Sequence, residues 1–252
     1  MAYPVKKLSK SQKKMWDELD GRTLVPTKFF DVPTLHSFGF YDCTLRMLVQ
    51  GGLGGLIDLH AATYKNLVLE FLATFEEKGS RLHFRIFDKD YHVTRADLAT
   101  IFGVTAPPSD DWRSIEGSQG FFDFWQIITG SRFDTRSGEY NYKIVHPCLR
   151  LCNKVLAMTF LGQGEVNKVS MRDMCMVWCL TPEQDEVPDW VDLFIASVKK
   201  VRTKKGRIGF GGMITLLALR FVTIDEIRSH CGTDVGDGFV YDTQMLKRVH
   251  CL

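Results

Sequence analysis

The stretch 61–102 constrains the fold most, because its apolar pattern changes from helical to alternating and back to helical. The apolar residues of 61–77 lie on one broad helical face. The segment LHFRIF at 82–87 then alternates between apolar and other residues, as a half-buried strand does, and 91–93 can return beside it after a turn. The stretch therefore predicts a helix, one small β-hairpin near residues 82–93 and a second helix.

The second helix of this stretch has recognisable signals at both ends. Thr94 is followed three residues later by Asp97, which resembles a capping box, and Gly103 suits the end of a helix over Arg95 to Phe102. A hairpin this small is not stable alone and must pack on its flanking helices. We therefore expect one connected core formed by Leu72, Phe75, Phe84, Ile86, Leu98 and Phe102.

The other periodic segments are also helical. Residues 33–49 and 120–128 have roughly helical apolar spacing. The second half predicts four or five helices, which start near His146, Ser170, Trp190, Gly211 and Thr223. We expect a mainly α fold, a multi-helix domain with the one small hairpin inserted.

The chain of 252 residues is long enough for one large domain or two small ones. Residues 1–31, rich in lysine, predict a basic N-terminal arm, and 32–252 predict a single helical domain. The turn-rich region near 105–140 is the candidate boundary between two subdomains. Asp242 is a candidate cap for a final helix.

Several classes of protein are excluded by composition. No apolar run approaches the length of about 18 residues that a membrane span needs, and no apolar stretch follows the basic N-terminus as a secretory signal requires. The seven cysteines are an odd number and predict reduced thiols in an intracellular protein of the nucleus or cytoplasm. The net charge of +2 means that any contact with nucleic acid must come from a local patch.

Motifs for catalysis, metals and nucleotides are missing from the sequence. Cys148 and Cys152 are four residues apart, as are Cys175 and Cys179, so with His146 a zinc site is conceivable; packed thiols are the alternative we favour, because the cysteines lie within apolar helices. The glycine-rich segment 51–55 lacks the lysine of a phosphate-binding loop. We expect no catalytic residue, no bound metal, no cofactor and no small-molecule substrate.

The strongest local feature is a run of six cations. Such a run suits a solvated loop, a nuclear-import signal or a contact with the phosphate backbone of RNA or DNA. It lies just before the helix that Gly211 starts, whose free amides are expected to add positive potential. The candidate contact residues are Lys199, Lys200, Arg202, Lys204, Lys205 and Arg207.

The order of segments resembles a plant family. The segments that carry the resemblance are TYKNLVLEFLATFE, LHFRIFDKDYHVTRADLATIFGV, HPCLRLCNKVLAMTFLGQGEVNKVSMRDMCMVWCL and GGMITLLALRF. Over residues 25–225 they are similar to the C-terminal domain of the protein encoded by the first open reading frame of Athila-type Ty3/gypsy retrotransposons, and plant transposon-protein and plant mobile domains share these features. The resemblance implies a protein that takes the place of gag in a transposable element, and it implies no catalytic residues.

Departures from retroelement proteins limit the function further. No zinc knuckle is present, the protease triplet fails because Arg136 follows Asp134 and Thr135, and the reverse-transcriptase motif is missing. Two hypotheses remain. One is a non-enzymatic, gag-like structural or accessory protein that self-associates and contacts RNA. The other is a host-retained nuclear protein–protein interaction module of plant mobile domain type, in which the loop 105–119 and the aromatic stretch 121–125 bind a protein partner.

Overall fold

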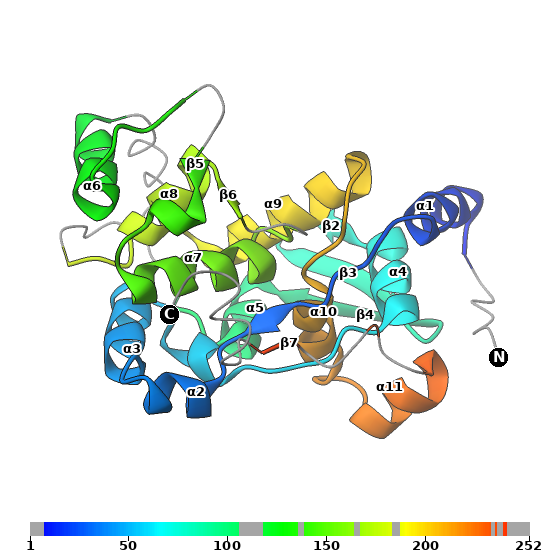
Figure 1. Cartoon of the computed structure of the whole chain (residues 1–252). Helices are drawn as coiled ribbons and strands as arrows, with labels where there is room; N and C mark the ends of the chain where they lie inside the picture. The colour runs from blue at the N-terminus through cyan, green and yellow to red at the C-terminus, as the bar shows by residue number, and fades with distance from the viewer. Residues whose placement is uncertain are drawn as a thin grey trace.

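A computed structural model of the chain describes residues 8–105, 118–135, 139–163, 167–182, 187–232, 235 and 239–240 (Figure 1). Lys6 and Lys7, most of the loop 105–119, and Asp242 therefore lie outside the described residues. The expected mainly α class is confirmed. In the part of the chain that the structure describes, none of the helices has the length and apolar character needed to cross a bilayer.

The described part of the chain consists mostly of helices, with a few short strands among them. The described helices are α1 Lys10–Asp20, α2 Val32–Ser37, α3 Tyr41–Gln50, α4 Lys65–Thr74, α5 Arg95–Phe102, α6 Gln119–Thr129, α7 Pro147–Thr159, α8 Met171–Trp178, α9 Trp190–Thr203, α10 Gly211–Ala218 and α11 Ile224–Cys231, with 3₁₀ turns η1 Gly54–Asp58 and η3 Asn141–Lys143. The described strands are β1 Lys28–Phe29, β2 Glu76–Lys78, β3 Arg81–Ile86, β4 Lys89–Thr94, β5 Glu139–Tyr140, β6 Lys168–Val169 and β7 Phe239–Val240. Strands β2, β3 and β4 form an antiparallel sheet, β5 and β6 an antiparallel pair, and β1 and β7 a parallel pair.

The four or five helices expected in the second half are found as α7 to α11, but two expectations for the first half are wrong in detail. The helix expected over 61–77 is α4 and ends at Thr74, because Glu76–Lys78 leaves it to pair with β3. The predicted hairpin therefore belongs to a three-stranded sheet. The helix expected over 33–49 is split into α2 and α3, since Gly39 between them has a φ of 70°.

The hairpin turns at Phe87 and Asp88, which both have positive φ. Their backbone N–H groups each donate to the Glu70 carboxylate at 2.8 Å, so α4 holds the turn of the sheet that packs on it. Burial is the main cause that raises the pKa of Glu70. Arg85, between Phe84 and Ile86 on β3, is also buried and is paired with Asp88.

Four helices begin at capping boxes. The Thr94 side chain accepts from the Asp97 amide and the Asp97 carboxylate accepts from the Thr94 amide, as the sequence predicts. Ser170 and Thr223 cap α8 and α11 in the same way, again as expected, and Ser9 caps α1. These boxes satisfy helix-terminal amides locally, which is why the sequence could place the helix starts.

The capping box of α5 leads to a stability prediction. Replacing Thr94 with alanine should lower the free energy of unfolding by about 1 kcal/mol, whereas serine should keep most of it, because serine retains the accepting oxygen. The Thr94 backbone amide, and then its hydroxyl, lower the pKa of Asp97. The stabilisation is therefore present above the ordinary aspartate pKa and is lost as pH falls through the lowered value. Urea unfolding of the parent and the variants at neutral and acid pH measures these free energies of unfolding. Equal stabilities of the parent and Thr94→Ala at neutral pH would contradict the prediction.

The glycine-rich segment 51–55 has a packing role. The Gly55 amide donates to the Gly103 carbonyl at 3.1 Å, and a Cβ on Gly55 would lie 2.7 Å from the Gly103 Cα. Gly103 itself ends α5 with a φ of 61°. The carbonyl of Gly51 accepts from Trp190 Nε1 at 2.7 Å. Glycine is needed here because two backbones touch, so the packing of η1 against the end of α5 accounts for it.

One connected cluster of buried residues runs from Leu19 to Ile227 and includes every member of the core predicted around the hairpin. It also joins residues on both sides of the candidate boundary near 105–140, since the rings of Phe102 and Phe160 lie 6.2 Å apart. Part of the predicted arm is packed too. Leu19 and Phe29 are buried in the cluster, so within 1–31 the described residues from α1 onward are attached to the domain.

Figure 1 shows α5, α9 and α10 in the middle of the molecule, with α6, α7 and α8 toward one end and α4 with its sheet toward the other. The C-terminal end of α9 and the loop after it project beside α1 (Figure 1). This arrangement places the predicted basic run next to α1.

Candidate nucleic-acid interface

The six predicted contact residues straddle the end of α9. Lys199, Lys200 and Arg202 belong to its final turns, Lys204 is its C-cap, and Lys205 and Arg207 follow in the loop. Cations in the last turn of a helix interact favourably with the partial negative charge of its carbonyls. The run is therefore part helix and part loop rather than a loop throughout.

Lys199 has an acidic partner on the three-stranded sheet. It forms an ion pair with Glu77 on β2, and Arg95 on α5 pairs with the same carboxylate. The hydrogen bond from Lys199 is the main cause that lowers the pKa of Glu77. Arg95 also pairs with Asp192, so these charges join β2, α5 and α9. Lys199 has a structural partner and is the weakest candidate for a phosphate contact.

Arg22, which the sequence did not single out, holds the loop in place. Its Nε donates to the Gly206 carbonyl at 2.6 Å and its Nη1 to the Val201 carbonyl at 2.5 Å, so it caps the end of α9. The Ile208 amide donates to the Thr23 carbonyl at 3.0 Å, which fixes the loop on the segment after α1. Burial lowers the pKa of Arg22.

Two adjoining hollows lie where these segments meet. The larger, of about 550 Å³, lies between α1 and the end of α9, and the smaller, of about 150 Å³, lies between α9 and residues 161–163. Arg22, Lys204 and Lys205 line both. We call the two hollows together the basic cleft, whose cations are Arg22, Lys200, Arg202, Lys204, Lys205 and Arg207.

The cations of the basic cleft differ in exposure. Lys200, Lys204, Lys205 and Arg207 are exposed, whereas Arg202 is half-buried. Its Nε is buried and has no hydrogen-bond acceptor among the described residues, and burial lowers its pKa. An anion in the larger hollow would compensate a guanidinium that water solvates poorly. Glu18 also lines this hollow, so the potential there is positive but not uniform.

The start of α10 does not contribute to the cleft, contrary to the expectation from sequence. Gly211 and Gly212 are buried, and the Gly212 amide donates to Thr27 Oγ1 at 2.8 Å. A Cβ on Gly212 would lie 2.8 Å from the Ala61 carbonyl oxygen. These glycines let α10 pack closely on the chain, so its first amides are inside the core and are not an anion site.

The paired cysteines lie in the core, as packed thiols do. Cys148, Cys152, Cys175 and Cys179 are all buried. Among the described residues one group has the spacing of metal ligands, and it combines Cys148 with Cys43 and His146 instead of with the other three. Cys43 comes from α3, so no local spacing in the sequence could indicate it.

The aromatic stretch 121–125 is not an exposed surface. Phe121 and Trp125 are buried and pack on Phe133, with ring centroids 5.4 Å and 5.0 Å away. Phe124 stacks on Trp178 of α8 at 5.7 Å. These rings attach α6 to the domain, because a large ring buried on a neighbouring helix stabilises the packing of both.

The chain matches a protein-family model. The model of a family described as the ATHILA ORF-1 family matches residues 6–179, which is more than half of the chain. No curated protein and no solved structure matches significantly. The matched range includes α1 to α8 and ends before the basic run, although α9 and α10 belong to the same core.

Proposed function

The chain belongs to the ATHILA ORF-1 family and is a retrotransposon-derived protein, and from this premise we propose that it is a gag-like structural or accessory protein. In this proposal it contacts the RNA phosphate backbone through the basic cleft and catalyses no reaction. The observation that carries it is the convergence of Arg22 with the cations of α9 and its loop around two adjoining hollows.

The chemistry of the basic cleft favours phosphate over base recognition. Lysine and arginine side chains bind phosphate oxygens and release condensed counterions, which is independent of sequence. The apolar residues that line the cleft, such as Met15, Leu19 and Leu161, are aliphatic, so the described lining offers no ring for base stacking. Binding is therefore expected to depend on salt and to be indifferent to base identity.

A protein partner is the second candidate, and a different observation favours it. Ile127 at the end of α6 is 81% exposed and Val145 is 71% exposed. The two lie close together, because the Val145 amide donates to the Ile128 carbonyl at 2.9 Å. An interaction module of plant mobile domain type would use a surface of this kind, and it would need no basic cleft.

A salt series with the full chain tests the first proposal. Binding to labelled single-stranded RNA should weaken steeply between low and physiological salt, with a log–log slope of roughly −2 to −4, because three to six phosphate contacts contribute about −0.7 each. Uridine and adenosine homopolymers should bind alike. A flat salt response, or no binding at low salt, would contradict RNA contact and favour the protein partner.

A further inference from the structure

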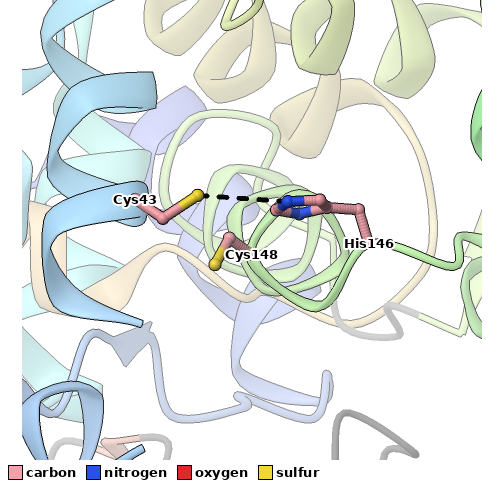
Figure 2. A group of neighbouring side chains, drawn as sticks. All are labelled: Cys43, His146 and Cys148. Atoms are coloured by element: carbon pink, nitrogen blue, oxygen red, sulfur yellow. Dashed lines mark hydrogen bonds between the residues drawn. The ribbon is translucent and has the colours of Figure 1, made fainter. Parts of the chain in front are cut away.

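Apart from the basic cleft, a cluster of two thiols and an imidazole lies between α3 and α7. Cys43 is in the first turn of α3, His146 is the N-cap of α7, and Cys148 is the second residue of α7. Figure 2 shows the Cys43 sulfur facing the His146 imidazole, with Cys148 beside them. One ligand atom from each residue lies within 4.8 Å of the other two, and Cys43 Sγ is 4.0 Å from His146 Nε2.

Helix capping accounts for one imidazole nitrogen, and the other is in a weak hydrogen-bond contact with the Cys43 sulfur. The Leu149 amide donates to His146 Nδ1 at 3.4 Å, so Nδ1 faces the start of α7 and Nε2 faces the thiols. Coordination through Nε2 would move the ring proton to Nδ1 and give up that long contact with Leu149. A metal–imidazole bond is far stronger than such a contact.

The ligand set and its spacing suit a thiophilic divalent ion. Two thiolates balance the charge of Zn²⁺ and a neutral imidazole completes three protein ligands, with water as the fourth. In a tetrahedral site with ligand bonds of about 2.0–2.3 Å, the ligand atoms lie roughly 3.5–3.8 Å apart. The three ligand atoms lie within 4.8 Å of one another, and Cys43 Sγ lies 4.0 Å from His146 Nε2, so the site needs a contraction of about 1.3 Å at most, which side-chain rotation supplies. We propose that Cys43, His146 and Cys148 form a zinc site that clips α3 to α7.

The surroundings of the thiols support ligation rather than simple packing. Both sulfurs come from residues in the first turn of a helix, where anionic ligands are favoured by the partial positive charge of the helix start. A divalent ion beside them deprotonates a coordinating thiol outright. The site departs from the sequence-based expectation of no metal at Cys148, while Cys152, Cys175 and Cys179 stay packed thiols.

The test measures zinc binding to the reduced, metal-free full chain. Titration calorimetry gives the affinity and stoichiometry for zinc, and the thiolate-to-metal absorption of cobalt(II), used in place of zinc, reports cysteine ligation. The expected result is one ion per chain and a rise in thermal stability with zinc. Cys43→Ser and His146→Ser should each weaken binding by about 100-fold or more. Both residues are at least partly exposed, and serine keeps an N-cap oxygen at 146, so both variants should fold.

Cys231→Ser is the matched control, because Cys231 is a half-exposed free thiol like Cys43 but belongs to no such group among the described residues. It should bind zinc as the parent does. The proposal is overturned if the parent binds no stoichiometric zinc, or if either Cys43→Ser or His146→Ser leaves the affinity unchanged. It is also overturned if Cys231→Ser weakens binding as much as Cys43→Ser.

Discussion

Replacing Phe84 with alanine is expected to lower the free energy of unfolding by about 3–5 kcal/mol, because the change removes a fully buried ring and leaves a cavity. Phe84 is 2% exposed on the inner face of β3. Its ring lies 5.1 Å from that of Phe71 on α4 and 6.0 Å from that of Phe221 after α10. The cavity would lie between α4 and the turn after α10 in the connected core, so little collapse can offset the loss.

His83→Ala is the matched control for this change. His83 precedes Phe84 on the same strand, points to the opposite face and is only partly buried, so its loss should cost under about 1 kcal/mol. Chemical denaturation of both variants at neutral pH measures the difference. A cost well under 1 kcal/mol for Phe84→Ala would mean that the sheet does not pack on α4 as the structure has it.

Elements with local signals could be predicted from the sequence. The start of α5 follows from Thr94 and Asp97, and its end follows from Gly103, because each signal acts within one turn of the helix. The inward face of β3 follows from the alternation of Leu82, Phe84 and Ile86.

Elements that depend on distant partners could not be predicted. The segment Glu76–Lys78 is polar and becomes a strand only because β3 lies beside it. The parallel pairing of Lys28 with Phe239 has no local signal either. The same holds for both candidate sites. The basic run at 199–207 is visible in the sequence, but Arg22 and Cys43 reach their sites through long-range packing. Lys199 is paired with Glu77 and does not line the cleft, and the sequence gives no sign of that pair.

The second prediction with a large expected effect concerns RNA affinity, and it rests on the proposed RNA contact of the basic cleft. The triple variant Lys200→Gln, Lys204→Gln and Lys205→Gln should bind single-stranded RNA about 100-fold more weakly at roughly 0.1 M salt, because each phosphate contact contributes about 0.7 log unit per decade of salt. Its log–log salt slope should be shallower by about 2. The fold should survive, since all three lysines are exposed and make no ion pair with a described acid.

A control variant removes the same charge elsewhere. Lys65, Lys78 and Lys199 lie outside the lining of the basic cleft and are already ion-paired, with Asp20, Glu76 and Glu77. Because these cations are neutralised locally, their replacement by glutamine should change RNA affinity by much less than the cleft variant does. If both triple variants lost affinity equally, RNA would respond to net charge and not to the cleft. If the cleft variant bound RNA as the parent does, the run would be a solvated helix end, and the exposed surface at Ile127 and Val145 would become the better candidate for function.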